Sequence, residues 1–129
     1  GLKTEIVPVV SARADAYARS FEAGRVISAE GGTFADGVDC RVPWEQPLEI
    51  LRRGAERIVR VSDDEIAEAM RVYHMDTHNM AEAAGAVPLA ALMQERARMQ
   101  GRRVGVILCG GNVDRSVYAE VLAGRTPKV

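Results

Sequence analysis

The most constraining feature of this sequence is a short apolar run that stops at a turn of small and polar residues. Residues 104–108, Val-Gly-Val-Ile-Leu, have the composition of a buried strand. The turn Cys109-Gly110-Gly111-Asn112 ends this run, and a segment typical of a helix start follows at Asp114. In open α/β folds, ligands bind outside the carboxyl ends of strands. The turn is therefore the first candidate binding site.

The rest of the chain alternates strand and helix patterns, which predicts an α/β fold with a parallel sheet and helices on both faces. Pro8 weakens the first expected strand, because proline cannot donate to a ladder. Ser11 is the expected cap of the first helix, and Ser62 and Glu65 have capping-box spacing. Gly24 is expected to end the first helix. The sequence predicts strands over 4–10, 57–61 and 104–108, and helices over 12–23, 48–54, 62–77, 83–99 and 114–122.

Composition excludes several classes of function. The chain has 129 residues and a net charge of −1, with no basic stripe interleaved with aromatic residues, so nucleic acid is not an expected partner. No apolar run approaches the length of a membrane span, and residues 1–10 lack the features of a signal peptide. Cys40 and Cys109 form no disulfide framework. A reducing, cytoplasmic setting is expected.

Taken alone, the turn at 109–112 leaves two interpretations open. It matches neither of the glycine-rich nucleotide-binding fingerprints, so no nucleotide site is predicted. A tight connection between a strand and a helix explains the two glycines as well as a ligand does. For Cys109 alone, a small buried side chain at a strand end is the preferred interpretation, since buried cysteine is common.

Four ordered segments decide between these interpretations: TFADGV at 33–38, IVRVSDDEIAEAM at 58–70, MAEAAGAVPLAAL at 80–92 and VGVILCGGNVD at 104–114. Together they resemble the C-terminal part of the catalytic domain of serine/threonine ammonia-lyases. These are fold-type II pyridoxal-phosphate enzymes, close to threonine dehydratase and serine racemase. The resemblance covers nearly the whole chain, from Thr4 to Asp114, and implies a tryptophan-synthase-β-like fold.

The resemblance assigns cofactor-binding roles to the turn. Cys109 takes the place of the residue that faces the ring nitrogen of pyridoxal phosphate, commonly a serine and sometimes a cysteine. A neutral thiol does not keep the pyridine protonated as an aspartate would, which suits a β-elimination. Gly110, Gly111 and Asn112 would shape the floor of the pocket. Asn112, like Asp114, could instead simply cap the last helix.

Two further residues receive roles from the resemblance. Glu82 matches an acidic residue near the ring face and would tune protonation there, as a catalytic group. The helix dipole alone also explains a glutamate at the start of a helix. Gly37 matches a loop whose backbone lines the other edge of the cofactor, although a plain turn glycine is the alternative.

The chain lacks two parts that the family needs. A fold-type II enzyme uses a lysine to hold the cofactor covalently, but Lys3 and Lys128 lie outside the matching context. The glycine-rich loop that binds the cofactor phosphate is also absent. In the family both precede the segment that residues 1–7 resemble. Residues 1–129 are thus expected to be the C-terminal portion of the catalytic domain, inactive alone.

No metal site is expected. Some family members bind a cation through acidic residues, but the matching positions here are Val10 and Ala16, and Asp15 nearby is a single ligand. His74 and His78 are four residues apart on an expected helix and so would share a face. They lack the glutamate of H-E-x-x-H and a third ligand, and a polar helix face is the preferred interpretation.

The expected function is therefore a pyridoxal-phosphate-dependent ammonia-lyase. It would act on a small-molecule amino acid, L-threonine or L-serine, and release a 2-oxo acid and ammonia by β-elimination. The resemblance leaves a serine racemase-type activity open. A non-catalytic half-domain that kept the sheet and lost the chemistry is the alternative from another class. The missing N-terminal portion is an expected partner, and the complete enzyme is an expected homodimer.

Overall fold

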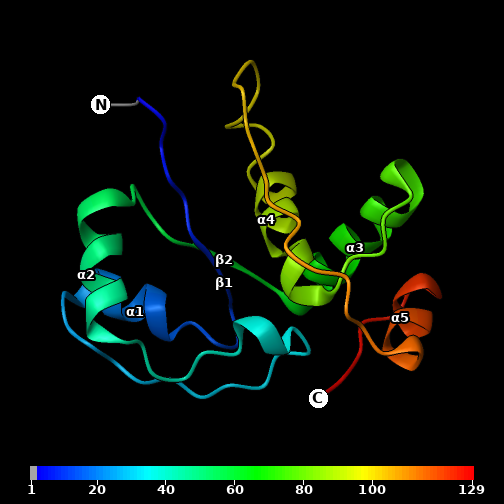
Figure 1. Cartoon of the computed structure of the whole chain (residues 1–129), viewed down its shortest axis with the longest axis horizontal. Coiled ribbons are helices and arrows are strands. Elements are labelled where there is room, and N and C mark those ends of the chain that lie inside the picture. The colour runs from blue at the N-terminus through cyan, green and yellow to red at the C-terminus, as the bar shows by residue number, and fades with distance from the viewer. Residues whose placement is uncertain (1–2) are drawn as a thin grey trace.

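A small parallel sheet lies between two groups of helices in the computed structural model, which describes residues 3–129. The helices α1 and α2 lie on one side of the sheet, and α3 and α4 lie on the other (Figure 1). The predicted arrangement of parallel strands with helices on both faces is confirmed. In chain order the elements are β1 (Val9–Ser11), α1 (Ala16–Ala23), the 3-10 helix η1 (Asp36–Val38), α2 (Glu45–Gly54), β2 (Val59–Val61), α3 (Asp63–Thr77), α4 (Ala83–Gln94) and α5 (Arg115–Leu122).

The sheet is shorter than the sequence predicts. β1 and β2 pair in parallel, and Val9 lies opposite Val59. Before β1 in the sequence, an isolated parallel bridge joins Ile6 to Ala55. Pro8 lies between this bridge and β1, and its missing N–H interrupts the ladder there. The expected strand over 4–10 is therefore reduced to a bridge and a short strand.

The strand expected over 104–108 does not form, so this prediction is wrong. These residues run extended beside α4 (Figure 1), but they make no backbone hydrogen bond to any residue in the range 3–129. A β-strand requires hydrogen bonds to a neighbouring strand, and neither of the strands formed by residues 3–129 pairs with this segment. Leu108 packs against the hydrophobic core and fixes the end of the segment nearest the turn.

The start of the first helix also differs from the prediction. Ser11 does not cap it: its Oγ accepts a hydrogen bond from the Arg13 N–H (3.2 Å) and forms a local turn. α1 begins at Ala16, with Asp15 as its N-cap. It ends as predicted at Gly24, which has φ 71° in the left-handed region.

The other helix boundaries follow local chemistry. In α3 the predicted capping box is confirmed, because Ser62 Oγ accepts from the Glu65 N–H (3.2 Å) and Glu65 Oε2 accepts from the Ser62 N–H (2.7 Å). α2 begins at Glu45, and Pro47 fits its first turn, where its missing N–H costs nothing. α4 ends at Gln94, five residues before the predicted end at residue 99.

The core lies where α3 packs against α4 and both cover the sheet. Alanine dominates the contact, which lets the two helix backbones approach closely. Ile66 and Met70 of α3 and Val87 of α4 supply the bulk and are at most 2% exposed. This packing holds the start of α4 in a fixed place beside the turn at 109–112.

A buried carboxylate ties the loop between α1 and η1 to the start of α3. The Thr33 hydroxyl donates to Asp63 Oδ1 (2.5 Å), and Asp63 is only 8% exposed. The Arg13 guanidinium lies 3.6 Å from Asp63 Oδ2. This contact anchors the loop that leads to η1.

Across residues 3–129 the structure contains no helix that combines the length and the apolar character needed to cross a bilayer.

Candidate functional site

The turn at 109–112 is held against the start of α4 by Glu82. The Glu82 N–H donates to the Gly110 carbonyl (3.1 Å). In the other direction, the Asn112 N–H donates to Glu82 Oε2 (3.1 Å). The structure thus brings together the predicted acidic residue and the predicted cofactor turn, which are far apart in the sequence.

The position of Glu82 is not explained by the helix dipole alone. Glu82 is the N-cap of α4, but its side chain makes no capping hydrogen bond. It reaches across to the backbone of the turn instead, and its Oε1 accepts no hydrogen bond from any residue in the described part of the chain. One carboxylate oxygen therefore orients the turn, while the other packs against Gly110.

Glycine at residue 110 leaves room for the Glu82 carboxylate. A Cβ added to Gly110 would lie 2.7 Å from Glu82 Cδ, well inside van der Waals contact. Gly37 reaches the same region from η1, where an added Cβ would lie 2.8 Å from the Ala84 Cβ in the first turn of α4. Gly37 therefore packs against the first turn of α4, and its role toward the cofactor stays a prediction.

Cys109 is exposed, so its interpretation as a buried apolar residue is wrong. Asn112 is also exposed, whereas Gly111 is partly buried. The last helix has Asp114 as its N-cap without a side-chain capping bond. The turn therefore presents the Cys109 thiol at the surface.

Tyr73 is a neighbour of the turn that the sequence does not reveal. It lies on α3, is 8% exposed, and its hydroxyl is buried without a hydrogen-bond partner in the structure. Burial raises the pKa of Tyr73, and the nearby Cys109 thiol acts in the same direction. A tyrosine at a core position of a helix carries no signal that separates it from an apolar residue.

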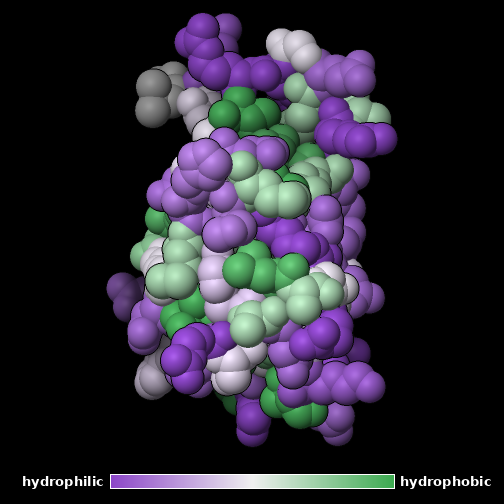
Figure 2. All heavy atoms as spheres, turned by 90° about the vertical axis from the view of Figure 1, so that its right-hand side faces the viewer, coloured by the Kyte–Doolittle hydropathy of each residue, from purple (hydrophilic) through white to green (hydrophobic). Residues whose placement is uncertain are grey.

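The surface near α3 and α5 carries both hydrophobic and hydrophilic side chains. Figure 2 shows hydrophobic patches that reach the surface there between hydrophilic ones. Met75 and Met80 are large apolar residues that are more than half exposed, at 58% and 54%. Met80 precedes Glu82 by two residues, so apolar surface lies close to the candidate site.

The two histidines do not share a helix face, which corrects the prediction. α3 ends at Thr77, and His78 caps it with φ 57° in the left-handed region. His74 Nδ1 lies 3.1 Å from the Tyr118 hydroxyl. Across residues 3–129 no three potential ligands of the His, Cys, Asp or Glu type are grouped to hold a metal ion.

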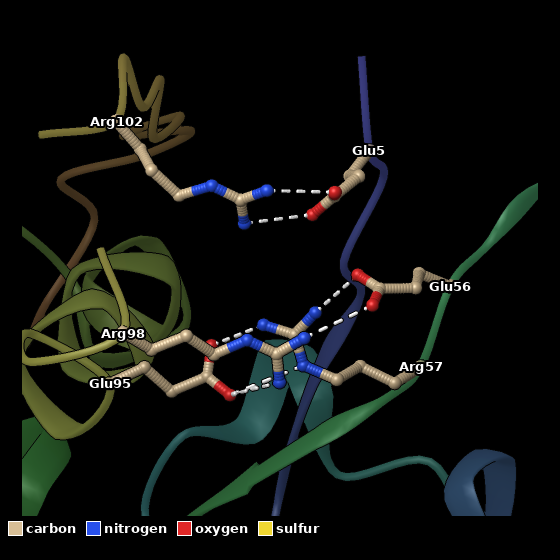
Figure 3. Close-up of polar contacts among 6 residues, drawn as sticks. All are labelled: Glu5, Glu56, Arg57, Glu95, Arg98 and Arg102. Carbon is tan, nitrogen blue, oxygen red and sulfur yellow. Dashed lines mark hydrogen bonds and ion pairs between the residues drawn. The ribbon is translucent and has the colours of Figure 1, made fainter. Parts of the chain in front are cut away.

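A cluster of charged residues lies at the end of segment 103–109 that is away from the turn at 109–112. Arg57 pairs with Glu95 and Glu56, and Arg102 pairs with Glu5 (2.9 Å) (Figure 3). The Arg57 guanidinium lowers the pKa of Glu95, and Arg102 lowers the pKa of Glu5. These pairs connect the N-terminal segment, the start of β2 and the end of α4. In the sequence such charges indicate only a solvated face.

The chemistry of the turn fits the pyridine end of pyridoxal phosphate. The exposed Cys109 thiol is a group that a ring nitrogen can contact, and Gly110 and Gly111 next to it carry no side chains of their own. Neither lysine fits the covalent attachment. Lys3 lies with Arg103 at the end of segment 103–109 away from Cys109, and Lys128 is exposed near the C-terminus.

Comparison with known proteins identifies the family. The family model described as pyridoxal-phosphate dependent enzyme matches residues 1–110. An L-threo-3-hydroxyaspartate ammonia-lyase of Pseudomonas sp is 36% identical over 107 residues, which are 82% of this chain and 34% of that protein. A phenylserine dehydratase of Ralstonia pickettii is 36% identical over 120 residues, 92% of this chain and 37% of that protein. The chain spans about a third of the length of these curated relatives.

Solved structures of similar proteins have the same fold as this chain. A threonine deaminase of T.th. has a TM-score of 0.80 and 36% identity, over 86% of this chain and 41% of that one. Isoform 2 of threonine deaminase from Solanum lycopersicum has a TM-score of 0.85 and 26% identity, over 94% of this chain and 34% of that one. The expected fold is confirmed, and the chain belongs to the family of pyridoxal-phosphate dependent enzymes.

Proposed function

We propose that the protein containing this chain is a pyridoxal-phosphate-dependent ammonia-lyase. It would deaminate a hydroxy amino acid to a 2-oxo acid and ammonia by β-elimination. The observation that carries the proposal is the turn at 109–112, which exposes the Cys109 thiol and is oriented by Glu82. The names of the relatives, which are ammonia-lyases, dehydratases and deaminases, support the reaction class.

Residues 1–129 form the C-terminal portion of the catalytic domain in this proposal. The lysine that bonds to the cofactor and the loop that binds its phosphate would come from the rest of the protein. The positions of Lys3 and Lys128, neither of which lies at the turn, support this division. The complete enzyme would be a cytoplasmic homodimer that binds a small-molecule amino acid.

Each site residue has a defined task. When bound, pyridoxal phosphate withdraws electrons from the carbon that loses its proton. The Cys109 thiol would lie against the ring nitrogen, in place of an aspartate that would keep it protonated. Glu82 holds the turn through Oε2, which accepts from the Asn112 N–H, and so would fix the position of the turn against the cofactor. Gly110 leaves room for the Glu82 carboxylate, and Gly37 lets the η1 loop pack against the first turn of α4, from where it would line the other edge of the cofactor.

The two free cysteines provide a matched test. The complete protein, loaded with cofactor, would be assayed for 2-oxo acid and ammonia with threonine, serine, threo-3-hydroxyaspartate and phenylserine. Cys109→Ala should reduce turnover by at least about tenfold and shift the visible absorption of the bound cofactor, because the ring nitrogen loses its neighbour. Cys40→Ala should change neither. Equal behaviour of the two variants, or no turnover of any of these substrates by the unsubstituted protein, would refute the proposal.

Racemisation is the second candidate. A serine racemase of maize has a TM-score of 0.78 and 25% identity, over 92% of this chain and 38% of that one. Chiral separation of the products distinguishes the two reactions. D-serine formed from L-serine faster than pyruvate would favour the racemase.

A further inference from the structure

The hydroxyl of Tyr73 is a buried polar group that the site described above does not use. Tyr73 is only 8% exposed, and its hydroxyl oxygen is enclosed without a hydrogen-bond partner among residues 3–129. Burying a hydroxyl without replacing its hydrogen bond to water destabilises the folded state. A phenylalanine would fill the same space without this cost. A partner for the hydroxyl is therefore expected near it.

The Tyr73 side chain lies on the core side of the turn at 109–112. Tyr73 belongs to the hydrophobic core cluster, and Leu108 and Val113, the residues directly before and after the turn, pack against this cluster. Ala81, which precedes the N-cap of α4, is a fully buried member of it. The core thus supports the turn from both of its ends, and Tyr73 supplies a polar atom to that support.

Among the polar side chains around the turn, the Cys109 thiol is the one that remains for Tyr73. The Glu82 carboxylate accepts from the Asn112 N–H (3.1 Å). On α5, the Tyr118 hydroxyl lies 3.1 Å from His74 Nδ1. Cys109 is a free cysteine, and its thiol lies near enough to raise the pKa of Tyr73, because a thiolate disfavours a second negative charge beside it.

We propose that Tyr73 is a positioning residue for Cys109, whose Sγ accepts a hydrogen bond from the Tyr73 O–H, directly or through one buried water. A thiol turns about a single bond, so the backbone of the turn does not by itself fix where Sγ points. An S–H group is a weak donor. Burial raises the pKa of Tyr73, which keeps the proton on its oxygen. Tyr73 is therefore the donor of the pair.

The pair determines which atom of Cys109 faces the cofactor ring. With Sγ engaged from the core side, the S–H of Cys109 is the group left to point at the ring nitrogen. A ring nitrogen that accepts from this S–H carries no proton of its own, as the proposed β-elimination requires. Tyr73 acts through Cys109 and contacts neither substrate nor cofactor. This consequence rests on the proposed function, whereas the pair itself does not.

A double-mutant cycle in the complete protein, freed of cofactor, tests whether the pair exists. Tyr73→Phe keeps the ring and removes only the hydroxyl. With Cys109 present, it should lower the urea midpoint by about 0.3 M, the shift expected for one hydrogen bond in a protein of the relatives' size. In a Cys109→Ala background the hydroxyl has lost its partner, so Tyr73→Phe should leave the midpoint unchanged or raise it. Equal shifts in the two backgrounds would overturn the proposal.

Alkylation of Cys109 by iodoacetamide tests the direction of the hydrogen bond. A donor to sulfur favours the thiolate, which is the reactive form. Tyr73→Phe should therefore slow alkylation at about pH 7.5 by at least about twofold. Tyr118→Phe is the matched control and should leave the rate unchanged, because the Tyr118 hydroxyl faces His74. Cys40 should react at one rate in all variants. An unchanged rate in Tyr73→Phe, or an equal decrease in Tyr118→Phe, would show the proposal to be wrong.

The absorption of the bound cofactor separates this inference from the proposed function. In the holoenzyme, Tyr73→Phe should shift the visible absorption in the same direction as Cys109→Ala, and Tyr118→Phe should not shift it. Coupling of Tyr73 to Cys109 in a protein without lyase activity would refute the function alone. An active lyase in which the two residues act independently would refute this inference alone.

Discussion

Replacing Gly110 by alanine tests whether Glu82 and the turn form one unit. The added Cβ would lie 2.7 Å from Glu82 Cδ, so either the carboxylate or the turn must move. Movement of the carboxylate breaks its hydrogen bond with the Asn112 N–H. Overpacking and the loss of a charge-assisted hydrogen bond each cost about 1–3 kcal/mol. We expect Gly110→Ala to lower the free energy of unfolding by about 1–3 kcal/mol.

Thermal unfolding measures this loss. The control is the same substitution at a glycine that has room for a side chain. For a chain of this size, 1 kcal/mol corresponds to a shift in Tm of about 4 °C. Gly54, the last residue of α2, has no atom within 4 Å of an added Cβ. Gly54→Ala should therefore raise the stability by about 0.4–1 kcal/mol, because alanine restricts the unfolded chain. The two substitutions should shift Tm in opposite directions.

A double-mutant cycle identifies the cause of the loss. In a Glu82→Ala background the carboxylate is gone, so Gly110→Ala should cost much less than in the unsubstituted protein. A coupling energy of about 1 kcal/mol or more is expected for groups in direct contact. If the two losses simply add, Gly110 does not depend on Glu82, and the reasoning that joins them is wrong.

Three further predictions concern stability. Ser62→Ala removes the capping box of α3 and should cost about 1 kcal/mol in urea unfolding, and an unchanged midpoint would contradict the cap's role. Thr33→Val leaves the buried Asp63 Oδ1 without its donor and should cost about 1–3 kcal/mol, a loss that Thr33→Ser should largely avoid. Arg57 lowers the pKa of Glu95 below 4.5 in the folded state, so this stabilisation is complete above that pH and is lost as the pH falls through the folded pKa. Unfolding measured from about pH 5 to 3 should thus depend less steeply on pH in Glu95→Gln, and identical slopes would disprove the linkage.

Local chemistry made parts of this fold predictable from the sequence. The capping box at Ser62 and the glycine after α1 were identified correctly because each acts within a few residues of the backbone it satisfies. The prediction that Ser11 caps the first helix is wrong. Its hydroxyl accepts from the Arg13 N–H in a local turn, and in the sequence such a turn looks the same as a helix cap.

Contacts between distant segments were not predictable in this way. The pattern of residues 104–108 indicates a strand, but strand formation depends on a neighbour, and the described residues provide none. The approach of Glu82 to the turn was expected only through resemblance to a family, because no spacing rule joins positions so far apart. The buried hydroxyl of Tyr73 gave no signal at all, since its ring fills a core position as an apolar side chain would.

The hydrogen bonds of Glu82 also have a consequence for engineering. They fix the turn at 109–112 from its far side, so the connection between Gln94 and residue 103 does not set the position of Cys109. The tip of this connection is exposed around Gln100, and Gly101 turns the chain with φ 74°. An affinity tag or a fluorescent label inserted after Gln100 would lengthen the connection and leave the thiol in place. This tip therefore provides a permissive position for following the protein in cells.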